Sequence, residues 1–170
     1  MLNMELALDA CSIILLAKAT VLETFSYWRT LMITDEVYNE VMEGKDKQLF
    51  DALLLERLVE EKKIAVEHQL NKDCVQKIIL DFGAGMGEAE SLALALTTKD
   101  KIIVTDNKQG RKVAKIQGLN LLGSIDVVVA LRKTGKISKE KALQALHILK
   151  KEGWFQEYLL EKAMEDISHA

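Results

Sequence analysis

The sequence predicts an α/β protein in which helices cover both faces of a short parallel sheet. Short apolar runs alternate with amphipathic segments of helical length, which is the pattern of consecutive strand–helix units. Two of these runs end at an aspartate, Asp9 and Asp106. The chain of 170 residues, 49% hydrophobic and 29% charged, has the size and balance of one folded domain with a core.

Five apolar runs are the predicted strands. A strand covered by helices on both faces is apolar throughout, so no alternation of polar residues is expected. Ligands of such sheets bind beyond the carboxyl ends of the strands, which makes the residues after each run the first candidates for a site. The runs are residues 5–8, 31–33, 64–66, 102–105 and 119–122.

Apolar periodicity and capping residues predict the helices. Thr34 and Ser124 are predicted N-caps, and Gly83, Gly85 and Gly87 predict a loop before a helix that starts at Glu88. The helices are expected at residues 11–17, 21–28, 34–44, 46–62, 72–82, 88–98, 107–117, from 124 onward, 138–152 and 155–167. In segment 46–62 one broad apolar face is expected, made of Leu49, Phe50, Leu53, Leu54, Leu58 and Val59.

The chain is predicted to divide into a domain of residues 1–135 and a C-terminal helical extension of residues 136–170 that packs on the same domain. The extension has more apolar residues than a peripheral hairpin needs for attachment. We therefore expect it either to contribute to a dimer or partner surface or to cover a face of the sheet. Four aromatic residues are expected to pack in the core rather than to stack on bases: Trp28, Trp154, Phe155 and Tyr158.

The composition argues against several classes of function. No apolar run approaches the ~18 residues of a membrane helix. The two cysteines, Cys11 and Cys74, form no disulfide framework, which favours a reducing cytoplasm. The three histidines match no ligand spacing, so a zinc site and Ser-His-Asp catalysis are poorly supported. A formal net charge of −3 does not indicate a strongly basic nucleic-acid binder.

Carboxylates lie beside apolar elements at four places: Asp9, Glu40, Glu88 with Glu90, and Asp106. Three of these have simple structural explanations. Glu40 could be a solvated helix residue, Glu88 could be stabilised by the positive end of the helix dipole, and Asp106 could cap a helix. Asp9 interrupts an apolar run, and a buried carboxylate is costly unless it is paired or binds a metal. Carboxylates that meet at one end of a sheet repel each other, and Mg²⁺ or Mn²⁺ would relieve that repulsion.

Four motifs follow one another in the order found in a known family. With them the chain resembles the PIN domain over residues 4–135, and its Gly-Glu-Ala-Glu sequence is similar to that of a prokaryotic, VapC-like toxin subgroup. The tail is similar to the helical extension of that subgroup. The motifs are Leu8-Asp9-Ala10-Cys11-Ser12-Ile13-Ile14, Val37-Tyr38-Asn39-Glu40-Val41, Gly87-Glu88-Ala89-Glu90-Ser91-Leu92-Ala93-Leu94-Ala95 and Val104-Thr105-Asp106-Asn107.

The resemblance implies a three-layer α/β/α sandwich with a short central parallel sheet. It implies an endoribonuclease that cleaves RNA phosphodiester bonds with Mg²⁺ or Mn²⁺, with the number of metal ions left open. It also implies a homodimer and, for a toxin, a small antitoxin protein as partner. The implied catalytic residues are the four motif acids Asp9, Glu40, Glu88 and Asp106.

Three of these acids, Asp9, Glu88 and Asp106, are the implied metal ligands. Glu90, Thr105 and Asn107 would support them or act in place of one. Of the two motif glutamates, Glu88 is expected nearer the metal, because residues two apart on a helix point about 200° away from each other.

Three positions depart from the family pattern. Cys11 stands where relatives often carry Ser or Thr, and Asn107 stands where many carry a second Asp. Glu88 is longer than the commoner Asp, so its distance to a metal would differ.

Basic residues recur at helical spacing after Asp106, at Lys108, Arg111, Lys112 and Lys115. We interpret them as a stripe on which an RNA backbone docks, with a solvated helix face as an equally weighted alternative. The leading hypothesis is a PIN-type metal-dependent ribonuclease. The alternative is a PIN-like binding or regulatory module of weak catalytic power, which a metal titration would distinguish.

Overall fold

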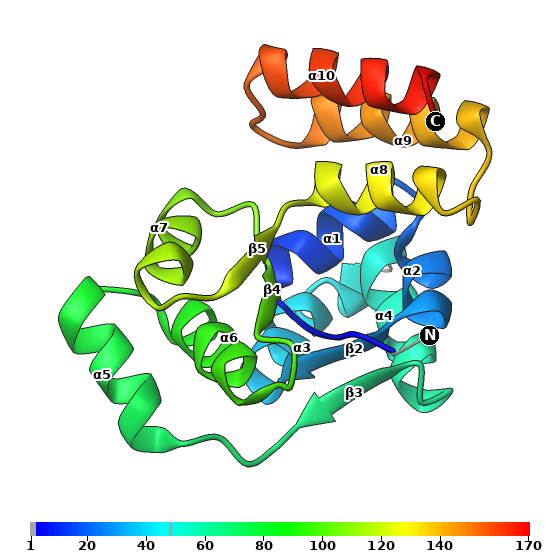
Figure 1. The fold of residues 1–170 in the computed structure, drawn as a ribbon. Coiled ribbons are helices and arrows are strands. Elements are labelled where there is room, and N and C mark those ends of the chain that lie inside the picture. Colours follow the sequence, from blue (N-terminus) through cyan, green and yellow to red (C-terminus); the bar gives the residue numbers. More distant parts are fainter. Residues whose placement is uncertain (1–2, 48) are drawn as a thin grey trace.

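The computed structural model describes residues 3–47 and 49–170. Five parallel strands form one sheet in the order β3-β2-β1-β4-β5, with helices on both faces (Figure 1). The strands are β1 (Glu5–Leu8), β2 (Thr30–Thr34), β3 (Ile64–Glu67), β4 (Ile102–Val104) and β5 (Asn120–Leu122). The predicted strands and the predicted parallel α/β/α architecture are confirmed.

Strand β1 lies at the centre of the sheet and fixes where the strands end. Its Ala7 is in register with Met32 of β2 on one side and with Ile103 of β4 on the other. Parallel pairing therefore brings the carboxyl ends of β1 and β4 to the same edge, where the backbone N–H of Asp9 donates to the Val104 carbonyl at 3.4 Å. The residues that follow these two strands are neighbours in space.

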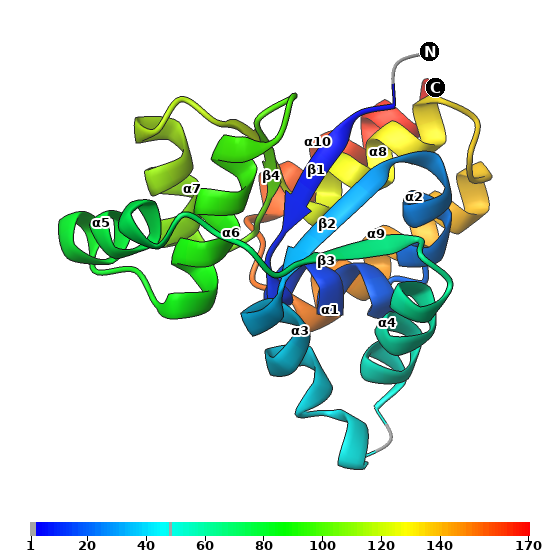
Figure 2. The same ribbon diagram turned by 90° about the horizontal axis from the view of Figure 1, so that it is seen from below.

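Helices form an outer layer on each side of the sheet (Figure 2). One layer consists of α5 (Lys72–Phe82), α6 (Met86–Thr97) and α7 (Lys108–Ile116). The other contains α1 (Ala10–Lys18), α2 (Leu22–Trp28), α4 (Phe50–Glu60) and α8 (Ser124–Lys133). Helix α3 (Asp35–Met42) follows β2 and packs against both α1 and α6, and a short 3₁₀ turn, η1 (Lys45–Lys47), precedes α4.

Alternate residues of each central strand enter two separate cores. Leu6 and Leu8 of β1 belong to the core beneath α1, α4 and α8, whereas Ala7 belongs to the core beneath α5, α6 and α7. In β4, Val104 and Ile103 divide in the same way. Burial on both faces explains why these strands read as continuous apolar runs.

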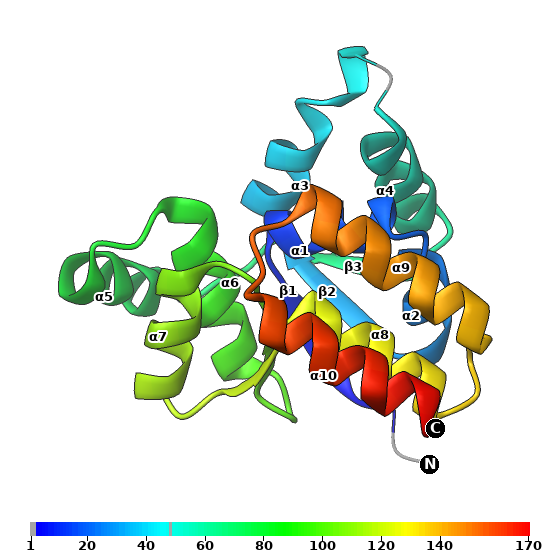
Figure 3. The same cartoon turned by 90° about the horizontal axis from the view of Figure 1, so that it is seen from above.

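Helices α9 (Lys139–Glu152) and α10 (Glu157–Ser168) form a hairpin that lies over α8 (Figure 3). Its buried residues Leu146, Leu149 and Leu160 belong to the same core cluster as Leu131 of α8. The predicted boundary at residue 135 falls in the turn between α8 and α9. The hairpin thus packs mainly on helices α8 and α1, and it shares their core.

Two helix predictions need correction. Helix α6 starts at Met86, two residues before the predicted start, so Gly87 lies in its first turn and not in a loop. The reason is that Gly85 is already extended at the N-cap, and its carbonyl accepts the Ala89 backbone N–H at 2.9 Å. In α4 the predicted apolar face is wrong in part, because Leu49, Phe50 and Leu53 are exposed. The buried row of α4 is Ala52, Leu54, Leu55 and Leu58.

The expectation that the aromatic residues pack in the core is correct for two of the four. Trp28 and Phe155 pack against the core, whereas Trp154 and Tyr158 are exposed. Phe155 fills the space over Gly153, where a Cβ atom would lie 2.3 Å from the Phe155 ring. Trp154, in the turn between α9 and α10, is therefore directed to solvent.

No single helix among residues 3–47 and 49–170 is long and apolar enough to cross a membrane. Helices α1 and α2 together reach that length, but the chain bends by 112° between them. Their apolar side chains, among them Ile13, Leu16 and Leu22, are buried in the core.

Candidate active site

Asp9 lies where β1 passes into α1, at the carboxyl edge of the sheet. Its Oδ1 accepts the Ser12 backbone N–H at 2.8 Å, which makes Asp9 the N-cap of α1. Its Oδ2 accepts the Thr105 hydroxyl at 2.5 Å. Burial raises the pKa of the Asp9 carboxyl, and the bonds from Thr105 and Ser12 act in the opposite direction. Asp9 is a buried acid that two elements hold in place.

Asp106 follows β4 and is held by α8. Its Oδ1 accepts the Ser124 backbone N–H at 2.9 Å, and its Oδ2 accepts the Ser124 hydroxyl. Burial raises the pKa of the Asp106 carboxyl, and the charge of Asp9 raises it further. The Ser124 bonds and the Arg111 guanidinium lower it. Since Asp9 acts on the pKa of Asp106, the two carboxylates belong to one cluster.

The cap residues near Asp106 differ from the sequence prediction. Asn107 caps α7, since its Oδ1 accepts the backbone N–H groups of Gln109 at 2.9 Å and Gly110 at 3.0 Å. The side chain of Asp106 is thus not the cap of α7. Ser124 is not the cap of α8 either, because Gly123 holds that position. The Ser124 hydroxyl bonds Asp106 instead, a partnership that the sequence analysis missed.

Glu40 comes from α3 and contacts α6. A Cβ atom at Gly87 would lie 3.2 Å from Glu40 Oε2, so the helices approach closely at this point. Burial raises the pKa of the Glu40 carboxyl, and the charges of Asp9, Glu43 and Glu36 add to this effect. Glu40 therefore faces the same cluster as Asp9, from an exposed position.

Glu88 lies in the first turn of α6 and is half-buried. Its Oε1 is shielded from solvent and has no hydrogen-bond partner within residues 3–47 and 49–170. Burial raises the pKa of the Glu88 carboxyl and the charge of Asp9 adds to this, while the backbone of Gly85 and of Gly110 lowers it. The charge of Asp9 thus acts on the pKa of each of the other three predicted catalytic acids, Glu40, Glu88 and Asp106.

Cys11, close to Asp9 in the chain, is influenced by three of the four acids. Burial and the charges of Asp9, Asp106 and Glu40, in that order, raise the pKa of its thiol to about 11. Without a bound metal, a thiol of this pKa is protonated at neutral pH and is therefore a weak nucleophile.

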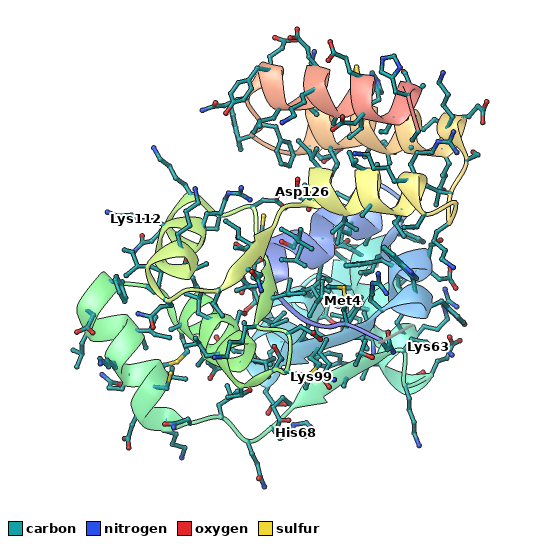
Figure 4. All side chains as sticks on the ribbon, viewed as in Figure 1. Met4, Lys63, His68, Lys99, Lys112 and Asp126 are labelled. Atoms are coloured by element: carbon teal, nitrogen blue, oxygen red, sulfur yellow. The ribbon has the colours of Figure 1, made fainter. Side chains whose placement is uncertain are left out.

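Glu90 faces a different part of the molecule from Glu88. It lines a cavity of about 320 Å³ together with Met86, Lys72 and His68. His68, which follows β3 (Figure 4), bonds Asp35 at 2.8 Å through its Nδ1. Helix geometry therefore separates the two glutamates as expected for residues two apart.

The predicted basic stripe is on α7. Lys108, Lys112 and Lys115 are exposed, and Lys112 projects from the outer side of α7 (Figure 4). Arg111 is half-buried, and its guanidinium donates to the Thr105 carbonyl at 3.2 Å. Arg111 thus fixes the loop that carries Asp106, while the lysines are open to solvent.

The donor set fits a hard divalent cation in kind. The acids raise the pKa values of their neighbours, and the buried oxygens Glu88 Oε1 and Ser12 Oγ have no hydrogen-bond partner in the described part of the chain. In their present positions no three His, Cys, Asp or Glu side chains of the described residues lie close enough to hold one ion. Binding would therefore require rotation of the longer side chains, Glu40 and Glu88, toward Asp9.

The chain matches the PIN domain family over residues 6–169. No curated protein matches it. The matched range includes Asp9, Glu40, Glu88 and Asp106, and it continues past residue 135 through the α9–α10 hairpin. The resemblance to the PIN domain is confirmed, whereas the VapC-like subgroup stays a prediction, and the chain belongs to the PIN domain family.

Proposed function

We propose that this protein is a metal-dependent endoribonuclease whose active centre is the cluster of Asp9, Glu40, Glu88 and Asp106. PIN domains are generally nucleases and typically use divalent metals, which supports hydrolysis of phosphodiester bonds at a coarse level. The observation that carries the proposal is geometric: the Thr105 hydroxyl, one residue before Asp106, donates to Asp9 and lies with Glu88 Oε1 against the same position of α7. The charge of Asp9 accordingly adds to the effect of burial in raising the pKa of each of the other three acids. Four like charges at the end of a parallel sheet are destabilising unless a cation binds among them.

Asp9, Glu88 and Asp106 are the residues that would hold Mg²⁺ or Mn²⁺, with Glu40 beside them. A bound ion of this kind activates water and stabilises the negative charge that develops on a phosphate during hydrolysis. Thr105 and Ser124 keep the carboxylates of Asp9 and Asp106 aimed at the cluster. Because those two acids are already oriented, only the glutamates need to reorganise when a cation binds.

The lysines of α7 supply the charge that attracts RNA. Lys108, Lys112 and Lys115 are exposed on the helix that begins two residues after Asp106. A phosphate backbone along this stripe would place neighbouring phosphates near the acids. In this proposal the stripe is the RNA-binding surface, and Arg111 contributes to it mainly by positioning the Asp106 loop.

The test is cleavage of a labelled single-stranded RNA by purified protein with Mn²⁺, with Mg²⁺ and with a chelator. Asp9→Asn is the site variant, and Asp81→Asn, at an exposed position of α5, is the matched control. We expect metal-dependent cleavage by the wild type and the control, and none by Asp9→Asn.

Equal cleavage by Asp9→Asn would show that the activity does not come from this cluster. Wild-type protein that neither cleaves RNA nor binds Mn²⁺ in a calorimetric titration would favour the alternative, a PIN-like binding or regulatory module. The two experiments together distinguish a nuclease whose active site lies elsewhere from a protein without nuclease activity.

We further propose a cytoplasmic toxin that a small antitoxin protein inhibits and that forms a homodimer. Both cysteines are free thiols, which is compatible with a reducing compartment. The hairpin presents Trp154, Tyr158 and Leu159 to solvent, which supports its predicted role in a dimer or partner surface. Growth arrest on expression that Asp9→Asn abolishes would support the toxin role. Light scattering of the wild type and of Trp154→Ser measures the oligomeric state, and a monomer at all concentrations would contradict the dimer.

A further inference from the structure

We propose that Gly110 of α7 is a positioning residue for Glu88, because the missing side chain at residue 110 provides the space that the Glu88 carboxylate occupies. This inference rests on the proposed function, in which Glu88 contributes to the metal-binding cluster. Helix α7 would then have two roles: its lysines bind RNA, and its Gly110 sets the position of Glu88 on α6.

The distances show how close the two residues are. A Cβ atom at Gly110 would lie 2.9 Å from Glu88 Oε1 and 3.1 Å from Thr105 Oγ1. Real Cβ atoms essentially never come within 3.0 Å of another heavy atom of this kind. Any residue other than glycine at position 110 therefore requires the Glu88 carboxylate to move.

Helix α7 has less freedom to move than the carboxylate. Its first turn is fixed by the Asn107 cap, whose Oδ1 accepts the Gly110 N–H at 3.0 Å, and by the Arg111 N–H, which donates to the Asn107 carbonyl at 2.9 Å. The backbone of Gly110 is helical and does not have a positive φ, so alanine fits it without strain. Alanine in place of glycine favours a helix by ~1 kcal/mol.

The Glu88 carboxylate, by contrast, is held only by backbone groups, those of Gly85 and Gly110, which lower its pKa. Its buried Oε1 has no side-chain hydrogen-bond partner within the described residues, so close contact with α7 also limits its position. The second neighbour of a Cβ at residue 110 is the Thr105 hydroxyl, which donates to Asp9. A variant that tests Glu88 must therefore also separate an effect on Glu88 from one on Thr105.

Aspartate makes that separation, because it is one methylene shorter than glutamate. The experiment compares the wild type, Gly110→Ala, Glu88→Asp and the double variant for Mn²⁺ affinity by calorimetry and for thermal unfolding in chelator. We expect Gly110→Ala to weaken Mn²⁺ binding about 10-fold, the lower end for residues that orient metal ligands. Its unfolding temperature in chelator should be equal to or above that of the wild type. The double variant should bind Mn²⁺ at least as well as Gly110→Ala, so that the two losses are less than additive.

Gly85→Ala is the matched control, since Gly85 is beside the same acid at the N-cap of α6 but a Cβ there would meet no atom within 4 Å. It should leave Mn²⁺ affinity unchanged. Wild-type affinity in Gly110→Ala would overturn the inference, and so would additive losses in the double variant, which would point to Thr105. A lower unfolding temperature of Gly110→Ala that Glu88→Asp does not restore would also overturn it. Wild-type protein without Mn²⁺ affinity would instead overturn the proposed function on which the inference rests.

Discussion

The acids that follow strands and the acids on helices are held in different ways. Asp9 and Asp106 each accept two hydrogen bonds, one at each carboxylate oxygen. Glu40 and Glu88 instead lie against a glycine of another helix, Gly87 and Gly110. Every carboxylate oxygen of the strand half of the cluster therefore has a hydrogen-bond donor before any ligand binds, whereas the buried Glu88 Oε1 of the helix half has no such partner among the described residues.

This difference has a physical origin in the sheet. The carboxyl ends of β1 and β4 are fixed by the register of the sheet. Asp9, after β1, accepts hydrogen bonds from Ser12 of α1 and from Thr105, and Asp106, after β4, accepts two from Ser124 of α8. Glu40 and Glu88 come from helices α3 and α6, outside the sheet, and their side chains are one methylene longer. In the proposed metal site the aspartates would supply orientation, and the glutamates would adjust to the size of the ion.

The largest effect is expected for Asp9→Asn, because it removes the negative charge that acts on all three other acids of the cluster. Orienting residues cost roughly 10- to 100-fold in metal affinity, so loss of the central ligand should exceed ~100-fold. The fold should persist, since the new amide can keep the Ser12 N–H bond and the Thr105 hydroxyl can turn to accept. Calorimetric Mn²⁺ titration and circular dichroism measure the two quantities. An affinity within 10-fold of the wild type would remove Asp9 from the metal site.

A comparison within α6 tests the helix half alone. Glu88→Gln should lower Mn²⁺ affinity at least about 10-fold. Glu90→Gln should change it less than twofold, because Glu90 lines the cavity beside His68 and not the acid cluster. The same titration serves both variants, with an RNA cleavage assay beside it. A larger loss from Glu90→Gln would contradict the placement of Glu88, and equal losses would mean that both side chains reach the ion.

Ser124→Ala tests whether the hydrogen bonds of the strand half matter. The variant removes the donor to Asp106 Oδ2 and leaves the backbone N–H that binds Oδ1. We expect about 10-fold weaker Mn²⁺ binding, since a half-held carboxylate must be ordered when the ion binds. Ser124→Thr keeps the hydroxyl and should restore most of the affinity. An unchanged affinity in Ser124→Ala would mean that Asp106 needs no second donor.

The sequence predicts the strand half of the cluster better than the helix half. Asp9 and Asp106 are predictable because apolar runs identify strands, and the residue after a strand in a parallel sheet lies at the ligand-binding edge. Their partners are harder to predict. Ser124 is 18 residues from Asp106, and the two meet only because β5 pairs with β4 and brings the start of α8 beside the loop.

The contacts of the glycines could not be predicted from local patterns. Gly87 and Gly110 would both be ordinary turn or helix-weakening residues by propensity. Their role depends on how closely α6 approaches α3 and how closely α7 approaches α6, which is a property of tertiary packing. The prediction for Trp154 is wrong for a related reason, since helical spacing does not tell which of two adjacent aromatics, Trp154 or Phe155, enters the core.

The smallest effect concerns stability without metal, and its sign follows from the raised pKa values. Burial raises the folded-state pKa of Asp9 above its unfolded value, so the folded protein binds more protons than the unfolded chain in the pH range between them. The free energy of unfolding that this proton binding contributes is fully present below about pH 4 and is lost as the pH rises through the folded-state pKa.

An asparagine at this position does not titrate. In chelator, the free energy of unfolding of Asp9→Asn relative to the wild type should therefore increase as the pH rises from about 4 to 7. One pKa unit between the folded and unfolded states corresponds to about 1.4 kcal/mol. Urea unfolding at several pH values measures the difference, and two curves that run parallel would show that the folded protein ionises Asp9 at no cost.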